Sequence, residues 1–154
     1  MEAITERTTV KVNKYIKAIY QSGILFLELP SGRRLAYPKP KVIEDDWYPG
    51  ANKIVFQAVN EKTWQWEEED TYGGKLVENI VQAVARDCLA HAMLKLDHMG
   101  YQIVMHVHDE VIIEIDENSD ELKIVCELMG QEIPWAPGLP LRADGYECPY
   151  YQKD

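Results

Sequence analysis

Residues 101–115 read YQIVMHVHDEVIIEI, two runs rich in valine and isoleucine that meet at His108, Asp109 and Glu110. β-Branched residues favour strands, and almost no residues remain between the two runs to form a loop. The stretch therefore predicts a tight β-hairpin that carries charged side chains at its tip.

The segment before this hairpin predicts the longest helix of the chain, over residues 75–99. Apolar side chains recur there at four-residue steps, and Gly100 follows at the expected end. On another face, Glu78, Gln82 and Arg86 share the same spacing, and periodicity alone predicts that this face is exposed. The apolar positions are Leu76, Ile80, Val84, Cys88, Ala92 and Leu96.

Three further predictions concern the N-terminal part. Residues 11–21 place apolar side chains at helical spacing and predict a short amphipathic helix. Residues 24–38 predict a hairpin that turns at Pro-Ser-Gly, with Arg33 and Arg34 just past its tip. Residues 39–50 are rich in proline and charge, which is typical of a surface loop.

The remaining segments give weaker patterns. Residues 54–59 predict one further strand, and the acidic run 67–70 lies in a stretch predicted to be irregular. After the charged hairpin, Asn118 and Glu121 resemble a capping box for a short helix. Residues 139–142 predict an edge strand. Together these elements predict an α+β fold, an antiparallel sheet backed by helices, with an N-terminal helix and a β-hairpin.

The formal net charge of −10 over 154 residues is divided unevenly. Residues 1–60 hold nine Lys or Arg against six Asp or Glu, a balance of +3, and residues 61–154 hold seven against twenty, a balance of −13. Clustered cations favour DNA phosphates, and carboxylates favour a hard cation such as Mg²⁺. Net charge therefore excludes neither kind of partner.

The sequence offers no membrane or export signal. No stretch approaches the roughly 20 apolar residues of a membrane span, and the polar N-terminus is unlike a signal peptide, so we expect a soluble, cytoplasmic protein. Cys88, Cys126 and Cys148 are odd in number and far apart, which predicts buried, reduced thiols and neither disulfides nor a zinc site.

Two interpretations of the hairpin tip follow from its chemistry. Adjacent carboxylates repel each other, and a divalent cation would compensate Asp109 and Glu110 while rigid strands hold Asp109 in place. Alternatively, Asp109 occupies the bend because Asp favours turns, and Glu110 lies in solvent. The residues alone leave both interpretations open.

A metallo-hydrolase is a third, weaker hypothesis. His106 and His108 alternate with valine and would share a strand face, as in a two-histidine metal site. Asp109 follows His108 directly, however, and Glu110 stands where a third histidine ligand would be expected. His106 is therefore interpreted as a packed or surface residue.

The run Val107-His108-Asp109-Glu110-Val111, after a long helix that contains Gln82, resembles the third catalytic motif of family A DNA polymerases, the bacterial polymerase I type. The helix sequence YGGKLVENIVQAVARDCLAHAM is similar to that of phage and prophage members. PSGRRLAYP and LPLRADGYECPYY extend the resemblance over essentially the whole chain.

The resemblance implies the palm-type sheet of such an enzyme and template-directed nucleotidyl transfer with two Mg²⁺ ions. The partners would be primer-template DNA and deoxynucleoside triphosphates. Asp109 would be a metal ligand, and Glu110 a catalytic neighbour that shapes the site. His108 would lie near the primer end, and Gln82 would reach the minor groove of the nascent duplex, whose acceptor pattern is nearly the same for every base pair.

The resemblance also assigns the other segments. Arg33 and Arg34 match a basic pair in the family's hairpin, and we expect them to contact DNA phosphates. Residues 1–74 would follow the family's fingers helix, and residues 75–154 would form the C-terminal palm subdomain. Glu78 falls where many relatives carry a different polar residue, so no role is carried over to it.

Two parts of the family's pattern have no counterpart here. These are the first motif, which supplies the other metal-binding aspartate, and the fingers helix, which holds the nucleotide. Glu44-Asp45-Asp46 lacks the Asp-Tyr-Ser context of that motif. We therefore expect a C-terminal polymerase fragment that binds Mg²⁺ weakly or not at all and is inactive without the missing N-terminal segment.

The alternative is a non-catalytic remnant, or a module that associates with DNA or with itself. Aromatic side chains would then remain exposed and favour a homo-oligomer. The candidates for such contacts are Trp47, Trp64, Trp66, Tyr150 and Tyr151.

Overall fold

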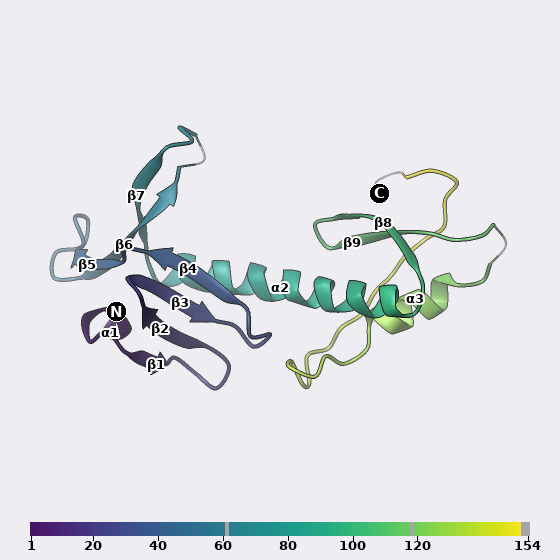
Figure 1. The fold of residues 1–154 in the computed structure, drawn as a ribbon, viewed down its shortest axis with the longest axis horizontal. Coiled ribbons are helices and arrows are strands. Elements are labelled where there is room, and N and C mark those ends of the chain that lie inside the picture. Colours follow the sequence, from purple (N-terminus) through teal and green to yellow (C-terminus); the bar gives the residue numbers. More distant parts are fainter. Residues whose placement is uncertain (61, 118, 152–154) are drawn as a thin grey trace. The chain divides into compact units, whose positions relative to one another are not determined.

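The computed structural model describes residues 1–60, 62–117 and 119–151, and Figure 1 shows its ribbon. The chain divides into two compact units, Met1–Gln82 and Ala83–Asp154. Helix α2 (Gly73–His98) contributes residues to both. Within the described ranges, no helix is both long enough and apolar enough to cross a membrane.

The first unit contains a short helix and two antiparallel sheets. Helix α1 spans Glu2–Thr5. The four-stranded sheet has its strands in chain order: β1 (Thr9–Lys11), β2 (Lys17–Gln21), β3 (Ile24–Glu28) and β4 (Arg34–Pro38). The three-stranded sheet follows: β5 (Lys41–Glu44), β6 (Asn52–Val59) and β7 (Trp66–Thr71).

One face of the four-stranded sheet forms the core of this unit. Alternate side chains point to opposite faces of a strand, so Leu25 and Leu27 of β3 are buried together while Phe26 between them is only partly shielded. Tyr37 of β4 packs edge-on against Phe56 of β6, with ring centroids 5.0 Å apart. These contacts join the two sheets.

The start of α2 closes the same core. The side-chain amide of Asn79 donates a hydrogen bond to the Tyr37 hydroxyl over 3.2 Å. Leu76 and Ile80, one turn apart, pack against the buried cluster. Burial raises the pKa of the Tyr37 hydroxyl, which therefore remains a neutral, hydrogen-bonded part of the core.

The second unit combines the rest of α2 with a two-stranded sheet, β8 (Gln102–Val107) and β9 (Glu110–Glu114), and helix α3 (Leu122–Met129). Leu96 is fully buried, and Ala92 and Ile133 are nearly so. His91 of α2 meets the Trp135 ring edge-on. An extended C-terminal segment without regular structure runs on from α3 to residue 151 (Figure 1).

The α+β fold class is confirmed, with antiparallel sheets and a short N-terminal helix. The hairpins predicted at 24–38 and 101–115 and the long helix predicted at 75–99 are also confirmed. The strand expected at 54–59 lies within β6. On α2, Glu78, Gln82 and Arg86 are exposed, as periodicity predicted.

The amphipathic helix predicted over residues 11–21 is wrong, because this stretch forms the end of β1, a turn and β2. The Asn13 side-chain oxygen accepts hydrogen bonds from the backbone N–H groups of Tyr15 and Ile16, both over 2.8 Å. Such an Asx turn gives the backbone an alternative to helical hydrogen bonds. Pairing of Ala18 with Leu27 then buries β2 as a strand.

Two other predictions for the first unit are corrected. The supposed loop 39–50 contains strand β5, and the acidic run 67–70 lies within strand β7. Lysines offset the like charges on β7: Lys41 pairs with Glu68 at 2.8 Å, and Lys53 lies 3.9 Å from Asp70.

Corrections in the second unit concern the tail and the cap. Residues 139–142 are not a strand; Pro140 lacks a backbone N–H to donate to a ladder. Cys148 in the same tail is exposed, and Cys88 and Cys126 are only partly buried, which corrects the prediction of buried thiols. Asn118 of the proposed capping box lies outside the described residues. Glu121, the N-cap residue of α3, makes no side-chain cap bond and accepts a hydrogen bond from the Tyr101 hydroxyl over 2.5 Å.

The turn between β8 and β9 is short and strained. Val107 pairs with Glu110, so His108 and Asp109 alone reverse the chain. His108 has a φ of 52°, in the left-handed region that costs a residue with a Cβ roughly 1–2 kcal/mol. A positive φ at this position suits the turn types that match the twist of a two-residue hairpin.

We expect Leu96→Ala to lower the free energy of unfolding of the second unit by about 2–5 kcal/mol, because it opens a cavity at a fully buried position. Leu94→Ala is the matched control, since Leu94 on the same helix is 60% exposed and should change stability by less than about 0.5 kcal/mol. Urea unfolding followed by circular dichroism measures both. Equal losses would contradict the assignment of the core.

The strain at the turn predicts that substitution by glycine changes the stability of the second unit in opposite directions at two nearby positions. His108→Gly should stabilise the second unit by about 1 kcal/mol, because glycine adopts a positive φ freely. His106→Gly, inside β8, should destabilise it by about 0.5–1 kcal/mol. Thermal unfolding of the two variants and the unchanged chain gives the comparison; a loss for His108→Gly would remove the strain argument.

Candidate functional site

The β8–β9 hairpin brings together three of the predicted site residues. His108 and Asp109 form the turn and Glu110 begins β9, and all three side chains are exposed. Asp109 is thus neither buried nor held inside the sheet. The hairpin gives it a fixed position at a solvent-facing tip.

A β-bulge lies one step back from this tip. Ile103 pairs with Ile113, but Met105 pairs with Ile112, so Val104 is an extra residue on β8. The bulge shifts the register, so that His106 stands opposite Val111. A bulge bends and twists its strand locally, which changes the direction in which the tip residues point.

The two carboxylates at the tip are uncompensated within the described part of the chain. Neither Asp109 nor Glu110 has a hydrogen-bond or ion-pair partner there, whereas Glu28, Glu68 and Asp70 on the sheets of the first unit are paired with lysine or arginine. Free carboxylate oxygens on adjacent residues are the kind of ligand that a hard divalent cation prefers.

The donor set suits such a cation only in part. Among residues 1–60, 62–117 and 119–151, no group of three or more His, Cys, Asp or Glu side chains is arranged to hold a metal ion. Asp109 and Glu110 could supply one or two oxygens to Mg²⁺, which often takes its other ligands from water and substrate phosphates. The two-histidine hypothesis fits less well, because His108 lies in the turn and not on the strand.

Gln82 is exposed on α2, where its side-chain amide donates a hydrogen bond to Glu78 over 3.2 Å. This bond links two polar side chains one turn apart on the exposed face of the helix. Gln82 belongs to the first unit, whereas the charged hairpin belongs to the second.

The predicted arginine pair lies at the start of β4. Arg34 is held by Glu28 on the neighbouring strand, with a nitrogen–oxygen distance of 2.9 Å, and its guanidinium carbon lies 5.9 Å from the centre of the Phe26 ring. Arg33 is exposed, and its backbone N–H donates to the Ser31 hydroxyl over 3.3 Å. Both side chains are accessible to a large anion.

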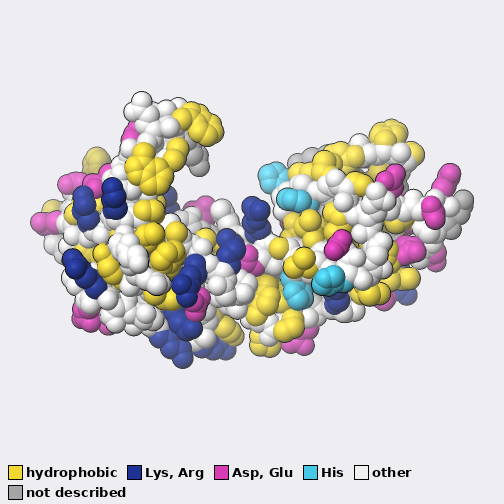
Figure 2. Space-filling view, in the orientation of Figure 1, with side chains coloured by type: hydrophobic (Ala, Val, Ile, Leu, Met, Phe, Trp, Pro, Cys, Tyr) yellow, Lys and Arg dark blue, Asp and Glu magenta, His cyan; other side chains and the backbone are white. Residues whose placement is uncertain are grey.

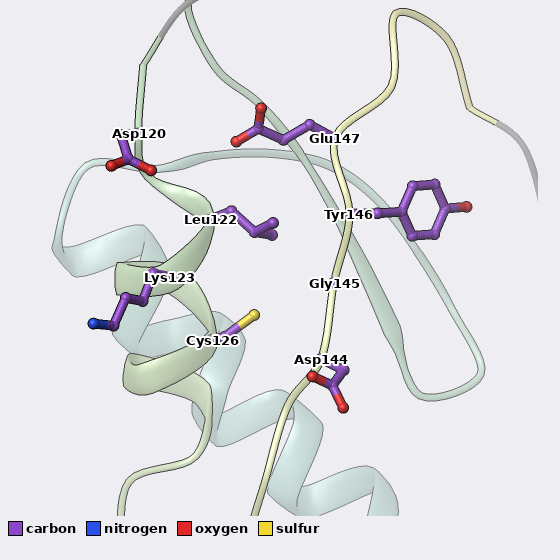
Figure 3. A pocket seen from close by; sticks show the side chains of 8 residues that line it. All are labelled: Asp120, Leu122, Lys123, Cys126, Asp144, Gly145, Tyr146 and Glu147. Atoms are coloured by element: carbon purple, nitrogen blue, oxygen red, sulfur yellow. The ribbon is translucent and has the colours of Figure 1, made fainter.

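The sequence patterns did not predict one hollow in the second unit. This hollow of about 590 Å³ lies between α3 and the C-terminal segment; Figure 3 shows the side chains that line it. Its apolar floor is formed by Leu122, Cys126 and Gly145, and a Cβ on Gly145 would come within 2.9 Å of Leu122. Charged residues form its rim: Asp120, Lys123, Asp144 and Glu147. This hollow contains none of the predicted site residues.

The aromatic side chains proposed as contact residues are exposed. Trp47 and Trp64 are the most accessible, at 84% and 82%. Trp66, Tyr150 and Tyr151 are exposed to lesser extents. These rings are accessible from solvent.

Comparison with known proteins yields one informative match. Over all 154 residues, the chain is 49% identical to a DNA polymerase of Bacillus phage SP02. The chain spans 24% of the length of that relative. No family model matches the sequence, and no solved structure matches it.

An identity of 49% along the whole chain includes the helix, the charged hairpin and the tail that carry the resemblance. The predicted resemblance is therefore confirmed at this level: the chain is homologous, from end to end, to a segment of a phage DNA polymerase.

Proposed function

We propose that this chain supplies the C-terminal palm portion of a family A DNA polymerase, with the β8–β9 hairpin as its catalytic element. The observation that carries the proposal is the 49% identity, over the whole chain, to a phage DNA polymerase. The exposed, unpaired carboxylates at the hairpin tip support it, because the sequence around them resembles the family's third catalytic motif.

In this proposal, Asp109 contributes a carboxylate oxygen to a Mg²⁺ site, and Glu110 adds negative charge beside it. Bound Mg²⁺ would lower the pKa of the primer 3′-hydroxyl and neutralise charge on the incoming triphosphate. The strained His108 turn holds Asp109 on two paired strands, and rigid support of this kind is what a catalytic ligand requires. His108 itself would lie near the primer end.

The other predicted residues would bind DNA. The amide of Gln82 offers both donor and acceptor groups to the minor groove, where nearly the same acceptors occur at every base pair. Arg33 and Arg34 would contact phosphates, which fix the position of a duplex without reading its sequence. The substrates would be primer-template DNA and deoxynucleoside triphosphates.

We also propose that these 154 residues do not synthesise DNA by themselves. Asp109 and Glu110 offer one or two ligands, and the described residues add no third donor to them. Mg²⁺ gives up its hydration reluctantly, so a site this sparse should bind it weakly. Activity would need the carboxylate and the nucleotide-binding groups that the family places on other segments.

A chimeric polymerase tests the proposal. The segment of the Bacillus phage SP02 enzyme that matches this chain is replaced by the chain itself, and primer extension is measured with Mg²⁺. We expect extension by the chimera and none by the isolated chain. Asp109→Ala should reduce extension by roughly 100-fold or more, because loss of even the groups that support metal ligands costs about 10–100-fold.

The matched control is Asp116→Ala. Asp116 is an exposed acid beyond the far end of the same hairpin, so its removal changes net charge equally without touching the tip. We expect this variant of the chimera to retain extension within about twofold, as for a surface change away from the site. A chimera that extends primers equally well with Asp109→Ala would refute the assigned role.

A further inference from the structure

The outer face of the four-stranded sheet in the first unit carries two ordered rows of side chains. Residues paired across antiparallel strands point to the same face, so the register defines each row. The first row is Lys11, Lys17, Glu28 and Arg34. The second is Thr9, Ile19, Phe26 and Ala36. The intervening residues, such as Leu25 and Leu27, form the core on the opposite face.

The first row holds three cations and one carboxylate. Lys11 is exposed, and the side chains of Lys17 and Arg34 are 54% and 42% exposed. Glu28 lies between them and accepts from Lys17 at 2.8 Å and from Arg34 at 2.9 Å. Hydrogen bonds from Lys17 and then Arg34 hold the pKa of Glu28 below its ordinary value, so it remains ionised. One anion thus orients two cations.

The dimensions of this row suit a nucleic-acid strand. Four strands about 4.8 Å apart span roughly 14 Å, which is about four base-pair steps of ~3.4 Å measured along the axis of a duplex. Phe26, in the adjacent row, lies beneath the Arg34 guanidinium. In Figure 2, Lys and Arg side chains are frequent over the part of the first unit that contains β1 to β4.

The neighbouring sheet has the opposite character. Strand β7 carries four acids in succession. Among the described residues, Glu68 is the only one of these acids whose side chain lies within hydrogen-bond distance of a lysine, which is Lys41 of β5 at 2.8 Å. A long polyanion would be attracted to the first sheet and repelled by the second. The first unit therefore has one sheet suited to phosphates and a neighbouring acidic sheet on which control substitutions can be made.

We propose that the outer face of the β1–β4 sheet binds the sugar–phosphate backbone of DNA through Lys11, Lys17 and Arg34, with Glu28 competing with the phosphates for two of these cations. The choice of DNA among polyanions rests on the proposed polymerase function; the surface itself rests on the register and the ion pairs. Binding of this kind is independent of base sequence.

Binding of the full 154-residue chain to a fluorescein-labelled DNA duplex, measured by anisotropy without Mg²⁺ or nucleotide, tests the surface. We expect Lys17→Ala to weaken binding several-fold and to reduce the slope of log affinity against log salt by about 0.9, the loss of one phosphate contact. Lys41→Ala is the matched control, because Lys41 has the same 2.8 Å pairing with a glutamate on the acidic sheet. Equal effects of the two variants would overturn the proposal.

The competition of Glu28 with DNA for Lys17 and Arg34 has its own test. Glu28→Gln removes the anion between Lys17 and Arg34 and should tighten DNA binding several-fold, because two cations become free to contact phosphates. Glu68→Gln makes the same charge change on the other sheet and should leave affinity within about twofold. If both variants bind DNA more tightly to the same extent, the change in net charge explains the effect, and the assignment to this face is refuted.

A competition experiment with a second polyanion is also decisive. Polyglutamate and unlabelled DNA are compared as competitors at equal charge concentration. If polyglutamate competes as well as DNA does, the surface is assigned to acidic proteins and the proposal is overturned. Circular dichroism confirms that each variant is folded, and Lys11→Ala supplies a second loss of one phosphate contact at an exposed position. Because this assay contains no Mg²⁺ and no nucleotide, its failure leaves the primer-extension result of the chimera unaffected.

Discussion

The pairing of Val107 with Glu110 is the constraint on which the candidate site depends. It leaves two residues to reverse the chain, and it forces His108 to a φ of 52°. The position of Asp109 is thereby set by backbone hydrogen bonds on both sides and not by its own side-chain contacts. Its carboxylate can remain without a partner in the described structure and still be held in place, which is the combination that a metal ligand needs.

Strand pairing also decides which side chains share a face in the first unit. Strand alternation places Leu25 and Leu27 in the core and leaves Phe26 and Glu28 on the outer face. Cross-strand pairing then gathers residues from four strands into one charged row, although they are up to 23 positions apart in sequence between Lys11 and Arg34. A surface of this kind is a product of register, and register is fixed by the apolar face that must be buried.

The sequence predicted the elements with strong periodicity and missed those decided by single polar side chains. Helix α2 and the two hairpins follow from apolar spacing. The 11–21 segment has helical spacing as well, but the Asn13 side chain caps a turn within it. Strand β7 is hidden in sequence by its acids; in the fold, lysines of β5 and β6 lie near Glu68 and Asp70, and Asn60 donates hydrogen bonds to Glu67 and Glu69.

The candidate site divides in the same way. His108, Asp109 and Glu110 are adjacent in sequence, so a short motif is enough to identify them. The bulge at Val104 and the row on the β1–β4 sheet depend on pairing partners that a single sequence does not specify. The sequence groups Arg33 and Arg34 as a pair, and the contact of Arg34 with Glu28 on the neighbouring strand depends on strand pairing.

The sparse donor set at the hairpin tip bears on which metal it can serve. Zinc sites take three or four protein ligands of the imidazole, thiolate or carboxylate type, and the described residues provide no such group. Mg²⁺ is commonly held by one or two carboxylates together with water and substrate phosphates. Asp109 and Glu110 match that second pattern. Under the proposed function, a cation at this tip would be bound firmly only together with a triphosphate, because the triphosphate would supply the remaining oxygens.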